Sequence, residues 1–190
     1  MTQRVRVYLA CSLDGFIAGE GNTLDWLAPP EGDPEDDGSG LDFPTFMSQV
    51  GAMLMGRTTH DVVAGMGVGW PYGDMPVLVA TTRALDPLVP SVRAVSGDIR
   101  SMLDQALEAA GPDGDVYLDG GALVRSALDA GLVDELVLTL IPIALGKGVP
   151  LFQGIAERQR FTFGEPVKFA GSMVQLVATP VKAAGAGPSE

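Results

Sequence analysis

Residues 52–61, AMLMGRTTHD, combine three features that decide how this chain folds. A short apolar run ends at Gly56 and continues at once into Arg57, Thr58 and Thr59, which begin a predicted helix. This pattern predicts a buried strand, a glycine turn and a helix N-terminus. The free amides and the dipole of such a terminus attract anionic oxygens. Two interpretations remain open, a binding site for an anion such as a phosphate and a purely structural turn.

The composition of the 190-residue chain is that of one globular domain. Hydrophobic residues make up 46% of it, no apolar run has the length of a membrane span, and the first residues do not resemble a signal peptide. The single Cys11 cannot form an internal disulfide, which together with these features favours a cytoplasmic protein. The net charge of −12 argues against nucleic acid and an acidic membrane surface as partners, because both would be repelled.

We expect one domain over residues 1–180, an acidic surface loop rich in proline and glycine over 28–40, and a flexible tail over 181–190. Apolar runs predict strands at 4–11, 16–18, 52–55, 76–80, 92–95, 115–118, 135–144, 161–168 and 173–180, with a turn at 146–150. Capping residues and helical spacing predict helices at 41–50, 58–64, 99–110 and from 121 to about 130.

This alternation predicts an α/β fold with a mostly parallel sheet and an antiparallel edge made by the last two strands as a hairpin. Ligands of such sheets bind at the carboxyl ends of the strands. Four polar or glycine-rich breaks each follow a predicted strand and can therefore converge on one rim. These breaks are residues 12–15, 56–59, 81–83 and 119–121.

Two of the breaks carry the groups that a phosphorylated ligand needs. Residues 56–59 and 81–83 each place hydroxyls and an arginine beside exposed amides, and a guanidinium can bind a phosphate with two hydrogen bonds. Two such places suit a ligand with separated phosphates, such as a dinucleotide, although each is also compatible with a turn and a solvated arginine. Gly120 and Gly121 either let a ligand approach the backbone or relieve steric strain in their turn.

Candidates for acid–base catalysis are few. His60 is the only histidine and is expected to be structural or at the surface, and Cys11 is expected in the core. Asp14, Asp25 and Asp42 are caps, turn residues or proton relays near the first strand and helix. The chain has neither a metal-binding motif, so no metal is expected, nor the glycine fingerprints of Rossmann and P-loop proteins. This shortage suits a reaction whose difficult step is performed by a cofactor, such as hydride transfer from a reduced nicotinamide.

Five motifs, taken in order, resemble those of the dihydrofolate reductase-like superfamily. They are ACSLDGFIA (10–18), MLMGRTTHD (53–61), VLVATTR (77–83), VYLDGGALV (116–124) and GLVDELVLTLIPIALGKGVPLF (131–152). They are most similar to the branch that contains the C-terminal reductase domain of bacterial riboflavin biosynthesis enzymes and many small stand-alone reductases. The resemblance implies a three-layer fold, in which helices cover both faces of a central sheet of about eight strands.

The resemblance also implies that NADPH binds along the predicted rim. Ala10 would lie near the nicotinamide, and a mobile loop containing Ser12 and Ile17 would cover it. Arg57 would lie near the adenosine 2′-phosphate. The peptide bond that joins Gly120 to Gly121 is expected to be cis. The remaining cofactor-binding positions implied by the resemblance are Gly56, Thr58, Thr59, Thr81, Thr82, Arg83, Gly120, Gly121, Ala122 and Leu123.

The chain departs from its better-known relatives where they hold the substrate. The acid that holds the pterin in dihydrofolate reductases aligns with residues 40–42, where Asp42 is the nearest carboxylate and the candidate catalytic residue. Tyr8 and Met47 stand where riboflavin-pathway reductases carry a lysine and an arginine. Large aromatic residues could wall a substrate pocket or anchor the core. The aromatic candidates for the pocket wall are Trp26, Trp70 and Tyr72.

These observations predict an NADPH-dependent reductase of a small heterocyclic or carbonyl substrate. Hydride would come from the nicotinamide, and a proton would come from water or from a carboxylate such as Asp42. The alternatives are a nucleotide-binding regulatory protein without turnover and a weak dihydrofolate reductase. The apolar stretch 135–144 and the resemblance to dimeric stand-alone proteins predict a homodimer.

Overall fold

The computed structural model describes residues 2–27, 40–67, 69–169 and 171–182, so most of the predicted acidic loop and flexible tail lies outside the described residues. Its main element is one large sheet, in which eight strands follow the order β10-β11-β7-β1-β6-β3-β4-β5 and β9 also pairs with β11. The strands of this sheet are β1 (Val5–Ser12), β3 (Val50–Gly56), β4 (Val77–Ala80), β5 (Val92–Val95), β6 (Asp115–Asp119), β7 (Glu135–Ile141), β9 (Phe161–Phe163), β10 (Val167–Phe169) and β11 (Met173–Pro180).

The sheet is parallel from β7 to β5 and antiparallel at its C-terminal edge. Strand β1 is central, since it pairs in parallel with β6 on one side and with β7 on the other. The remaining parallel pairs are β3 with β6, β3 with β4, and β4 with β5. Strand β11 runs antiparallel to β7, β9 and β10. This arrangement confirms the predicted α/β class with a mostly parallel sheet and an antiparallel edge.

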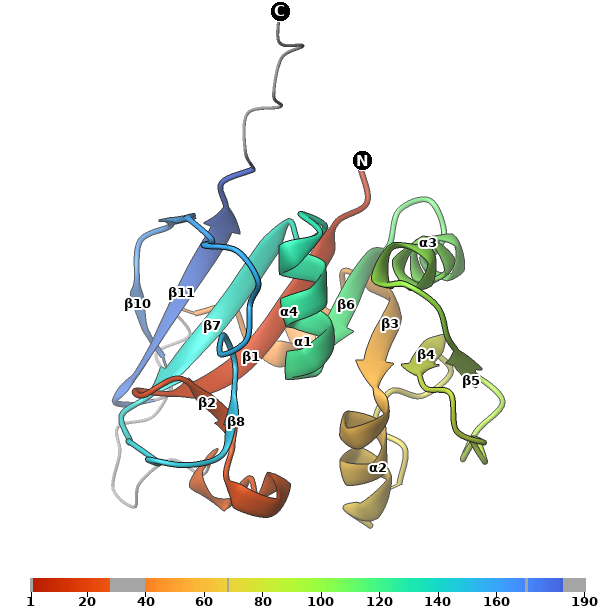
Figure 1. Ribbon diagram of the computed structural model, residues 1–190, viewed down its shortest axis with the longest axis horizontal. Helices are drawn as coiled ribbons and strands as arrows, with labels where there is room; N and C mark the ends of the chain where they lie inside the picture. Colours follow the sequence, from red (N-terminus) through yellow and green to blue (C-terminus); the bar gives the residue numbers. More distant parts are fainter. Residues whose placement is uncertain (1, 28–39, 68, 170, 183–190) are drawn as a thin grey trace, which may run out of the picture.

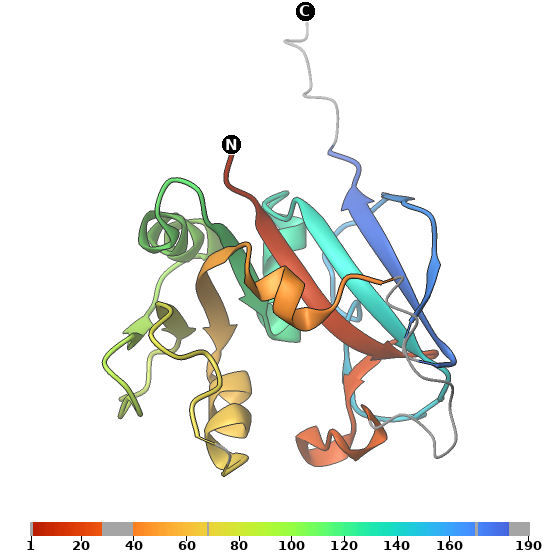
Figure 2. The same ribbon diagram turned by 180° about the vertical axis from the view of Figure 1, so that it is seen from behind.

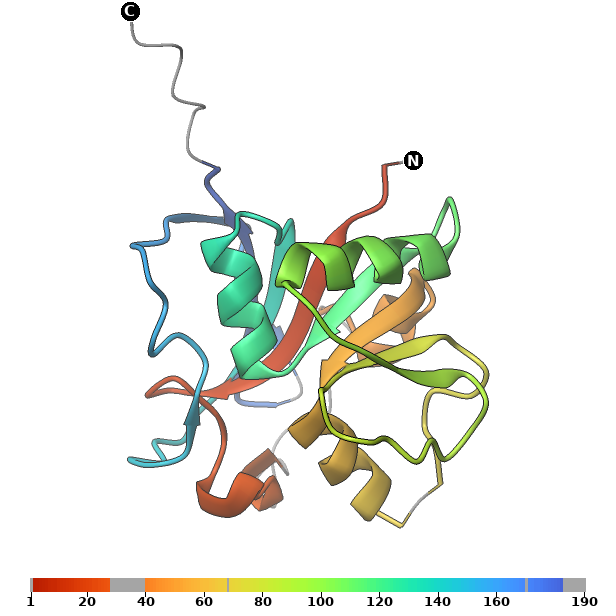
Figure 3. The same ribbon diagram turned by 45° about the vertical axis from the view of Figure 1, so that its right-hand side comes forward.

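Helices cover both faces of the sheet (Figures 1 and 2). Helices α3 (Ile99–Ala110) and α4 (Gly121–Asp129) lie on one face, and α1 (Phe43–Met47) lies on the other. Helix α2 (Arg57–Gly65) continues from β3 and projects beyond its carboxyl end (Figure 3). None of these helices, which belong to the described part of the chain, is long and apolar enough to cross a bilayer.

Two apolar clusters, one on each side of the sheet, hold these layers together. The cluster beneath α3 and α4 contains fully buried side chains such as Leu54 and Leu118. The cluster beneath α1 contains Phe46, Met53 and Met55. Leu54 and its neighbours Met53 and Met55 therefore point to opposite faces of β3, which explains why this strand is apolar without interruption.

Helix boundaries follow the capping residues. Asp98 caps α3 as predicted, since its carboxylate accepts a hydrogen bond from the Ser101 amide at 3.0 Å. Asp42 caps α1 in the same way, with 2.6 Å to the Thr45 amide. Helix α1 is shorter than the predicted range 41–50, because the cap stands before Phe43 and β3 already begins at Val50.

Several predicted boundaries at the C-terminal side were wrong, and proline explains two of them. Strand β7 ends at Ile141, because Pro142 has no amide hydrogen to donate. The predicted strand 161–168 is divided into β9 and β10 around Gly164 and Pro166. The predicted turn 146–150 ends in a short strand, β8 (Val149–Pro150), which pairs with β2 (Phe16–Ala18) as a separate two-stranded sheet.

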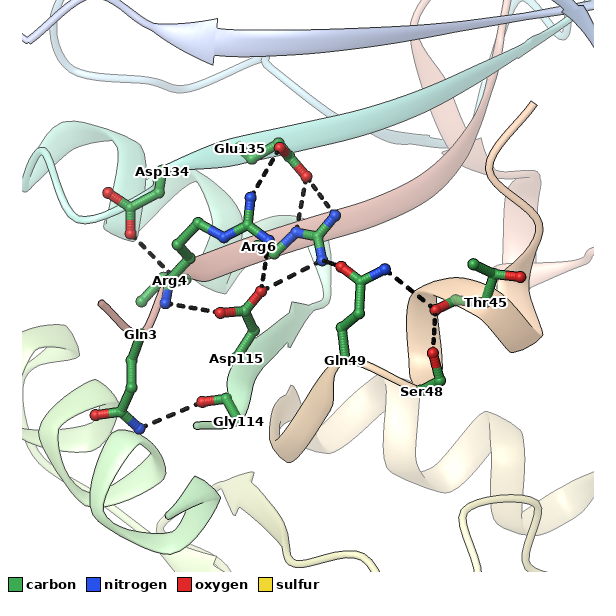
Figure 4. A network of polar contacts seen from close by, with 11 residues as sticks. Gln3, Arg4, Arg6, Thr45, Ser48, Gln49, Gly114, Asp115, Asp134 and Glu135 are labelled. Atoms are coloured by element: carbon green, nitrogen blue, oxygen red, sulfur yellow. Dashed lines mark hydrogen bonds and ion pairs between the residues drawn. The ribbon is translucent and has the colours of Figure 1, made fainter. Parts of the chain in front are cut away.

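A buried ionic network joins β1, β6 and β7 at their amino ends (Figure 4). Arg6 is only 3% exposed, and its Nε donates to Glu135 at 2.7 Å. Its Nη1 donates to Gln49 at 2.7 Å and to Asp115 at 3.3 Å. The same guanidinium lies 4.8 Å from the centre of the Phe46 ring. This network stabilises the end of the sheet opposite the rim where the predicted site lies.

Candidate functional site

A pocket of about 560 Å³ opens at the carboxyl ends of β1 and β6, between the beginnings of α2 and α4. Ligands of open α/β sheets bind in this position, and the volume is that of a small-molecule site. The predicted cofactor positions that line the pocket are Ala10, Ile17, Thr58, Thr59, Gly120, Gly121 and Ala122. The structure thus brings together segments from three of the four predicted breaks or their flanks. The predicted positions that do not line it are Ser12, Gly56, Arg57, Thr81, Thr82, Arg83 and Leu123.

A second hollow of about 570 Å³ lies between the end of α4 and the end of β11, and Asp129, Arg158 and Lys182 are among the residues that line it. It is remote from the carboxyl ends of the parallel strands, and none of the predicted site residues lines it. The pocket at the rim is therefore the candidate site.

The two glycine turns of the rim contact each other. Gly120 has a φ of +102°, a backbone conformation that side chains disfavour. A Cβ at Gly120 would lie 3.0 Å from the Thr59 hydroxyl oxygen and 3.4 Å from the Gly56 nitrogen, so these turns can approach only because the residue is glycine. The prediction of a cis bond between Gly120 and Gly121 was wrong, since the described residues contain no cis peptide. The positive φ of Gly120 makes the sharp turn instead.

The predicted phosphate-binding arginines, Arg57 and Arg83, lie beside the pocket and share Asp61 as an ion-pair partner. The Arg57 Nε donates to Asp61 at 2.7 Å, and its Nη1 donates to the Ala84 carbonyl at 2.9 Å. Arg83 lies 3.8 Å from the other Asp61 oxygen, and its amide donates to the Thr81 hydroxyl at 3.1 Å. The hydrogen bond from Arg57 is the main cause that lowers the pKa of Asp61. The breaks after β3 and β4 therefore form one polar cluster along the rim.

The segment that follows β1 is held by hydrogen bonds at both of its ends. The buried Ser12 hydroxyl donates to Asp14 at 2.6 Å and accepts from the Phe16 amide at 2.9 Å. The Asp14 carboxylate also accepts from the amides of Leu145 and Gly146 at 3.0 and 2.7 Å. The Ser12 hydroxyl is the largest of the influences that lower the pKa of Asp14 to about 2. Asp14 thus acts as a turn residue that joins two loops.

Strands β2 and β8 cover the pocket, and we call residues 16–18 and 149–150 the roof. Ile17, Ala18 and Val149 of the roof line the pocket and present apolar surface to it. The strands lie so close that a Cβ at Gly148 would meet the Ala18 carbonyl oxygen at 2.1 Å. The resemblance implied a mobile loop here, whereas the structure shows a paired strand.

Asp119, the last residue of β6, is a pocket residue that sequence analysis missed as an acid. Its carboxylate accepts a hydrogen bond from the Gly120 amide at 2.7 Å. Burial raises the pKa of Asp119 to about 6, against the lowering effect of hydrogen bonds from Gly120 and Tyr117. In the sequence, the position of this acid is indicated only by a carboxylate at the end of an apolar strand, directly before two glycines. The same pattern is typical of a turn. Acids with raised pKa values in pockets are frequent at functional sites.

Tyr8 lines the pocket where the riboflavin-pathway reductases carry a lysine. Its hydroxyl donates to the Leu41 carbonyl at 2.9 Å. The buried Gln175 holds both polar groups of the same residue, since it accepts from the Leu41 amide at 2.7 Å and donates to the carbonyl at 3.0 Å. The backbone that leads into α1 is thereby fixed beside the pocket. The phenol supplies a neutral polar wall in place of a positive charge.

The other predicted substrate residues do not reach the pocket. Asp42 is exposed and caps α1, as described above. Trp26 packs with Ile141 and Met173 in a third apolar cluster. Trp70 and Tyr72 pack against each other, with 5.2 Å between their ring centres, on the α1 side of the sheet. Their arrangement corresponds to the alternative that these aromatic residues anchor the core.

His60 and Cys11 have the surroundings of structural residues. His60 is 4% exposed, and its ring centre lies 5.8 Å from that of Trp70. Cys11 is 3% exposed and belongs to the core cluster under α4, as predicted. Burial is the main cause that raises the pKa of the Cys11 thiol to about 11, which leaves it a poor nucleophile. Within the described ranges, no three His, Cys, Asp or Glu side chains gather as a metal site requires.

Known proteins are similar to this chain in sequence and in fold. YyaP of Bacillus subtilis (strain 168), an uncharacterized protein, is 30% identical over 190 residues, which covers 92% of this chain and 94% of YyaP. A protein of Shewanella sp. PV-4, assigned to riboflavin biosynthesis by name only, is 31% identical, with a TM-score of 0.80 over 95% of this chain and all of that one.

A bifunctional deaminase and 5-amino-6-(5-phosphoribosylamino)uracil reductase of Thermotoga maritima shares the fold, with a TM-score of 0.64 and 18% identity over 95% of this chain and 57% of that one. The fold is therefore dihydrofolate reductase-like, as the five motifs implied. The model of the RibD C-terminal domain matches residues 3–175. A match over nearly the whole of the described sheet, with the rim turns in place, establishes that the chain belongs to the RibD C-terminal domain family.

Proposed function

We propose that this protein is an NADPH-dependent reductase of a small heterocyclic or carbonyl compound. The observation that carries the proposal is the rim pocket, where an acid of raised pKa and two helix N-termini meet at the carboxyl ends of parallel strands. Membership of a riboflavin-pathway type of reductase family supports the reaction class. The neutral phenol of Tyr8, where riboflavin-pathway reductases carry a lysine, argues for a substrate other than a ribosyl phosphate.

The residues of the pocket fit a dinucleotide. Gly120 and Gly121 line the pocket at the start of α4, and Thr58 and Thr59 line it at the start of α2. The unpaired amides of both helix termini favour phosphate oxygens. Ala10 is small enough to leave space for a flat ring beside β1. When bound, the reduced nicotinamide supplies hydride.

The protein's own contribution to the reaction is to exclude water and to hold a proton. The apolar roof lines one part of the pocket, which reduces the contact of solvent with atoms that react beside it. Asp119 retains its proton up to a pH of about 6 and donates it to the substrate as hydride arrives. Asp119 thus takes the part that sequence analysis assigned to Asp42. The rate of reduction should fall as the pH rises above 6, because the donor is then ionised.

The test combines NADPH titration with turnover of a substrate panel. Protein fluorescence should report NADPH binding, and oxidation of NADPH at 340 nm should follow at least one carbonyl, pyrimidinone or pterin compound. Asp119→Asn should lower kcat about 100-fold or more while NADPH still binds. Absence of NADPH binding at millimolar concentration would refute the proposal.

Two alternatives correspond to other results of the same panel. Tight NADPH binding without oxidation by any compound would identify a nucleotide-binding regulator, which the missing lysine and arginine at Tyr8 and Met47 motivate. Oxidation by dihydrofolate alone, inhibited by antifolates, would identify a weak dihydrofolate reductase.

We further propose that the protein acts in the cytoplasm as a homodimer. β1 and β11 pair with β7 along both of its edges, so a dimer cannot form by adding a strand to the stretch 135–141. This part of the proposal rests on the resemblance to dimeric stand-alone reductases. If light scattering of the purified protein gives the mass of one chain, the proposal of a homodimer is refuted.

A further inference from the structure

Arg125 is the one positively charged side chain among the described residues that line the pocket. All twelve Lys and Arg residues of the chain lie within the described ranges, and the other eleven do not line this pocket. No carboxylate in the described structure forms an ion pair with Arg125, although the chain carries a net charge of −12. A partly buried guanidinium without a counter-ion, inside a pocket of an acidic protein, needs an explanation.

The guanidinium of Arg125 lies over the first turn of α4. Arg125 follows Gly121 by four residues, so the two share one face of the helix. A Cβ at Gly121 would lie 3.0 Å from the Arg125 Nη1, which shows that the side chain folds back across the glycine. The free amides and the positive dipole end of α4 are in the same place. Gly121 therefore leaves the space that the guanidinium occupies.

Only one nitrogen of this guanidinium has a hydrogen-bond partner in the described structure. The Arg125 Nη1 donates to the carbonyls of Pro150 at 2.7 Å and Leu151 at 3.3 Å, which fastens the end of the roof. Arginine has five N–H groups, so those on Nε and Nη2 remain for a ligand. Guanidinium groups bind phosphates through two adjacent N–H groups. The Arg125 Nε and Nη2 keep contact with solvent, from which a ligand can approach them.

The other rim arginines are differently placed. Arg57 and Arg83 stand outside the pocket, and both lie within ion-pair distance of Asp61. Their charges are partly neutralised before any ligand arrives. Lys147 is exposed and lines a shallow neighbouring hollow with Gly19 and Gly148. Arg125 alone offers an unneutralised charge beside free amides within the pocket itself.

We propose that Arg125 binds the diphosphate that bridges the two halves of the dinucleotide, and that the same guanidinium fixes the roof over it. The inference rests on the proposed function. It assigns the charge that holds the centre of the ligand to α4, and it leaves the adenosine end to the cluster around Arg57. Because Nη1 holds the roof while the rest of the group faces the ligand, one side chain aligns the cover with the bound molecule.

The test measures binding of two probes that differ in the diphosphate, 2′-phospho-ADP-ribose and adenosine 2′-monophosphate. Arg125→Met should weaken the first about 10- to 100-fold and the second less than about threefold. The salt dependence of binding of the first probe should also become less steep, because a phosphate contact is lost. Arg125→Gln removes the charge but keeps a neutral amide donor, and it should reproduce the loss for the first probe.

Two matched variants separate charge from roof position. Lys147→Met removes a nearby charge outside the pocket and should change neither probe by more than about twofold. Asp14→Ala loosens the other end of the roof and should leave the ratio of the two affinities unchanged. An equal loss of both probes in Arg125→Met, or full affinity of Arg125→Gln for 2′-phospho-ADP-ribose, would show that Arg125 only fastens the roof. Failure of the unmodified protein to bind either probe or NADPH would instead overturn the proposed function, and this inference with it.

Discussion

Replacing Asp119 by asparagine should make the protein more stable at neutral and alkaline pH. Burial raises the pKa of Asp119 from 3.8 to about 6, so the folded state holds this proton more tightly than the unfolded chain does. Each pKa unit corresponds to about 1.4 kcal/mol. The raised pKa therefore lowers the unfolding free energy by about 2–3 kcal/mol once the acid is ionised. The lower value takes into account that solvent in the pocket reaches one side of the Asp119 carboxylate. Asparagine resembles the protonated acid, because it keeps an oxygen for the Gly120 amide and adds a donor.

The sign and the pH range of this effect can be tested together. Below pH 4 the acid is protonated in both states, so Asp119→Asn and the unmodified protein should have equal stability. Between pH 4 and 6 the unfolded chain ionises first, and the stability of the unmodified protein falls relative to the variant. Above pH 7 the full difference should appear in urea unfolding, with a rise in Tm of about 5–10 °C for the variant. Asp14→Asn is a control of opposite sign, because the pKa of Asp14 is lowered to about 2 and its charged form is the stabilising one. A difference that does not change with pH, or a less stable Asp119→Asn protein at pH 8, would refute the reasoning.

Three further predictions concern the rim and the two ends of the sheet. Arg57→Ala should weaken NADPH at least tenfold more than NADH in fluorescence titrations, and an equal loss would show that Arg57 does not contact the 2′-phosphate. Gly51→Ala should lower the unfolding free energy by about 1–3 kcal/mol, because its Cβ would meet the Ala110 carbonyl oxygen at 2.2 Å, whereas the control Gly65→Ala has open space and should be neutral or stabilising. Arg6→Met should cost about 3–5 kcal/mol, because it removes the buried guanidinium that Asp115 and Glu135 share and leaves them only the outer one of Arg4. Arg4→Met, whose side chain is 43% exposed, should cost about 1 kcal/mol or less, and similar losses for both variants would contradict this account of the network.

Local signals sufficed to predict those elements whose boundaries depend on nearby residues. The strand β5 at 92–95 has the predicted bounds, and α3 begins after Asp98 and ends before Gly111 because cap and stop signals flank an apolar stripe. The rim followed from the same logic, since each polar break comes directly after an apolar strand. Parallel strands then place their carboxyl ends together whatever their order in the sheet.

The strand at 16–18 was predicted, but its partner in the roof was not, because their pairing depends on a contact between distant segments. Strand β8 has only two residues, one of them Pro150, and no periodicity that would indicate a strand. Its pairing with β2 joins positions more than a hundred residues apart. The flexible glycines around Lys147 suggested a turn, which is what the local sequence alone supports.

Asp119 and Arg125 were missed for different physical reasons. The raised pKa of Asp119 comes from burial at the end of β6, and burial depends on the whole fold. Arg125 occupies a helix position where an exposed arginine is ordinary, and its direction depends on the carbonyls of Pro150 and Leu151, which are distant in the sequence. Trp26, Trp70 and Tyr72 pack in or against apolar clusters, which is the more frequent place of large aromatic residues.

The central place of β1 has a consequence for how the chain acquires its fold during synthesis. Both neighbours of β1 come from residues 115–141, so Val5 must wait for Val116, and Leu9 for Leu138, before either is paired. β1 therefore emerges before both of its partners and completes its pairing only after residues 115–141 have been made. Long-range parallel pairing of this kind is slow, and unpaired apolar strands are prone to aggregate. Yield should therefore depend on slow growth or chaperones, even where the finished protein is stable.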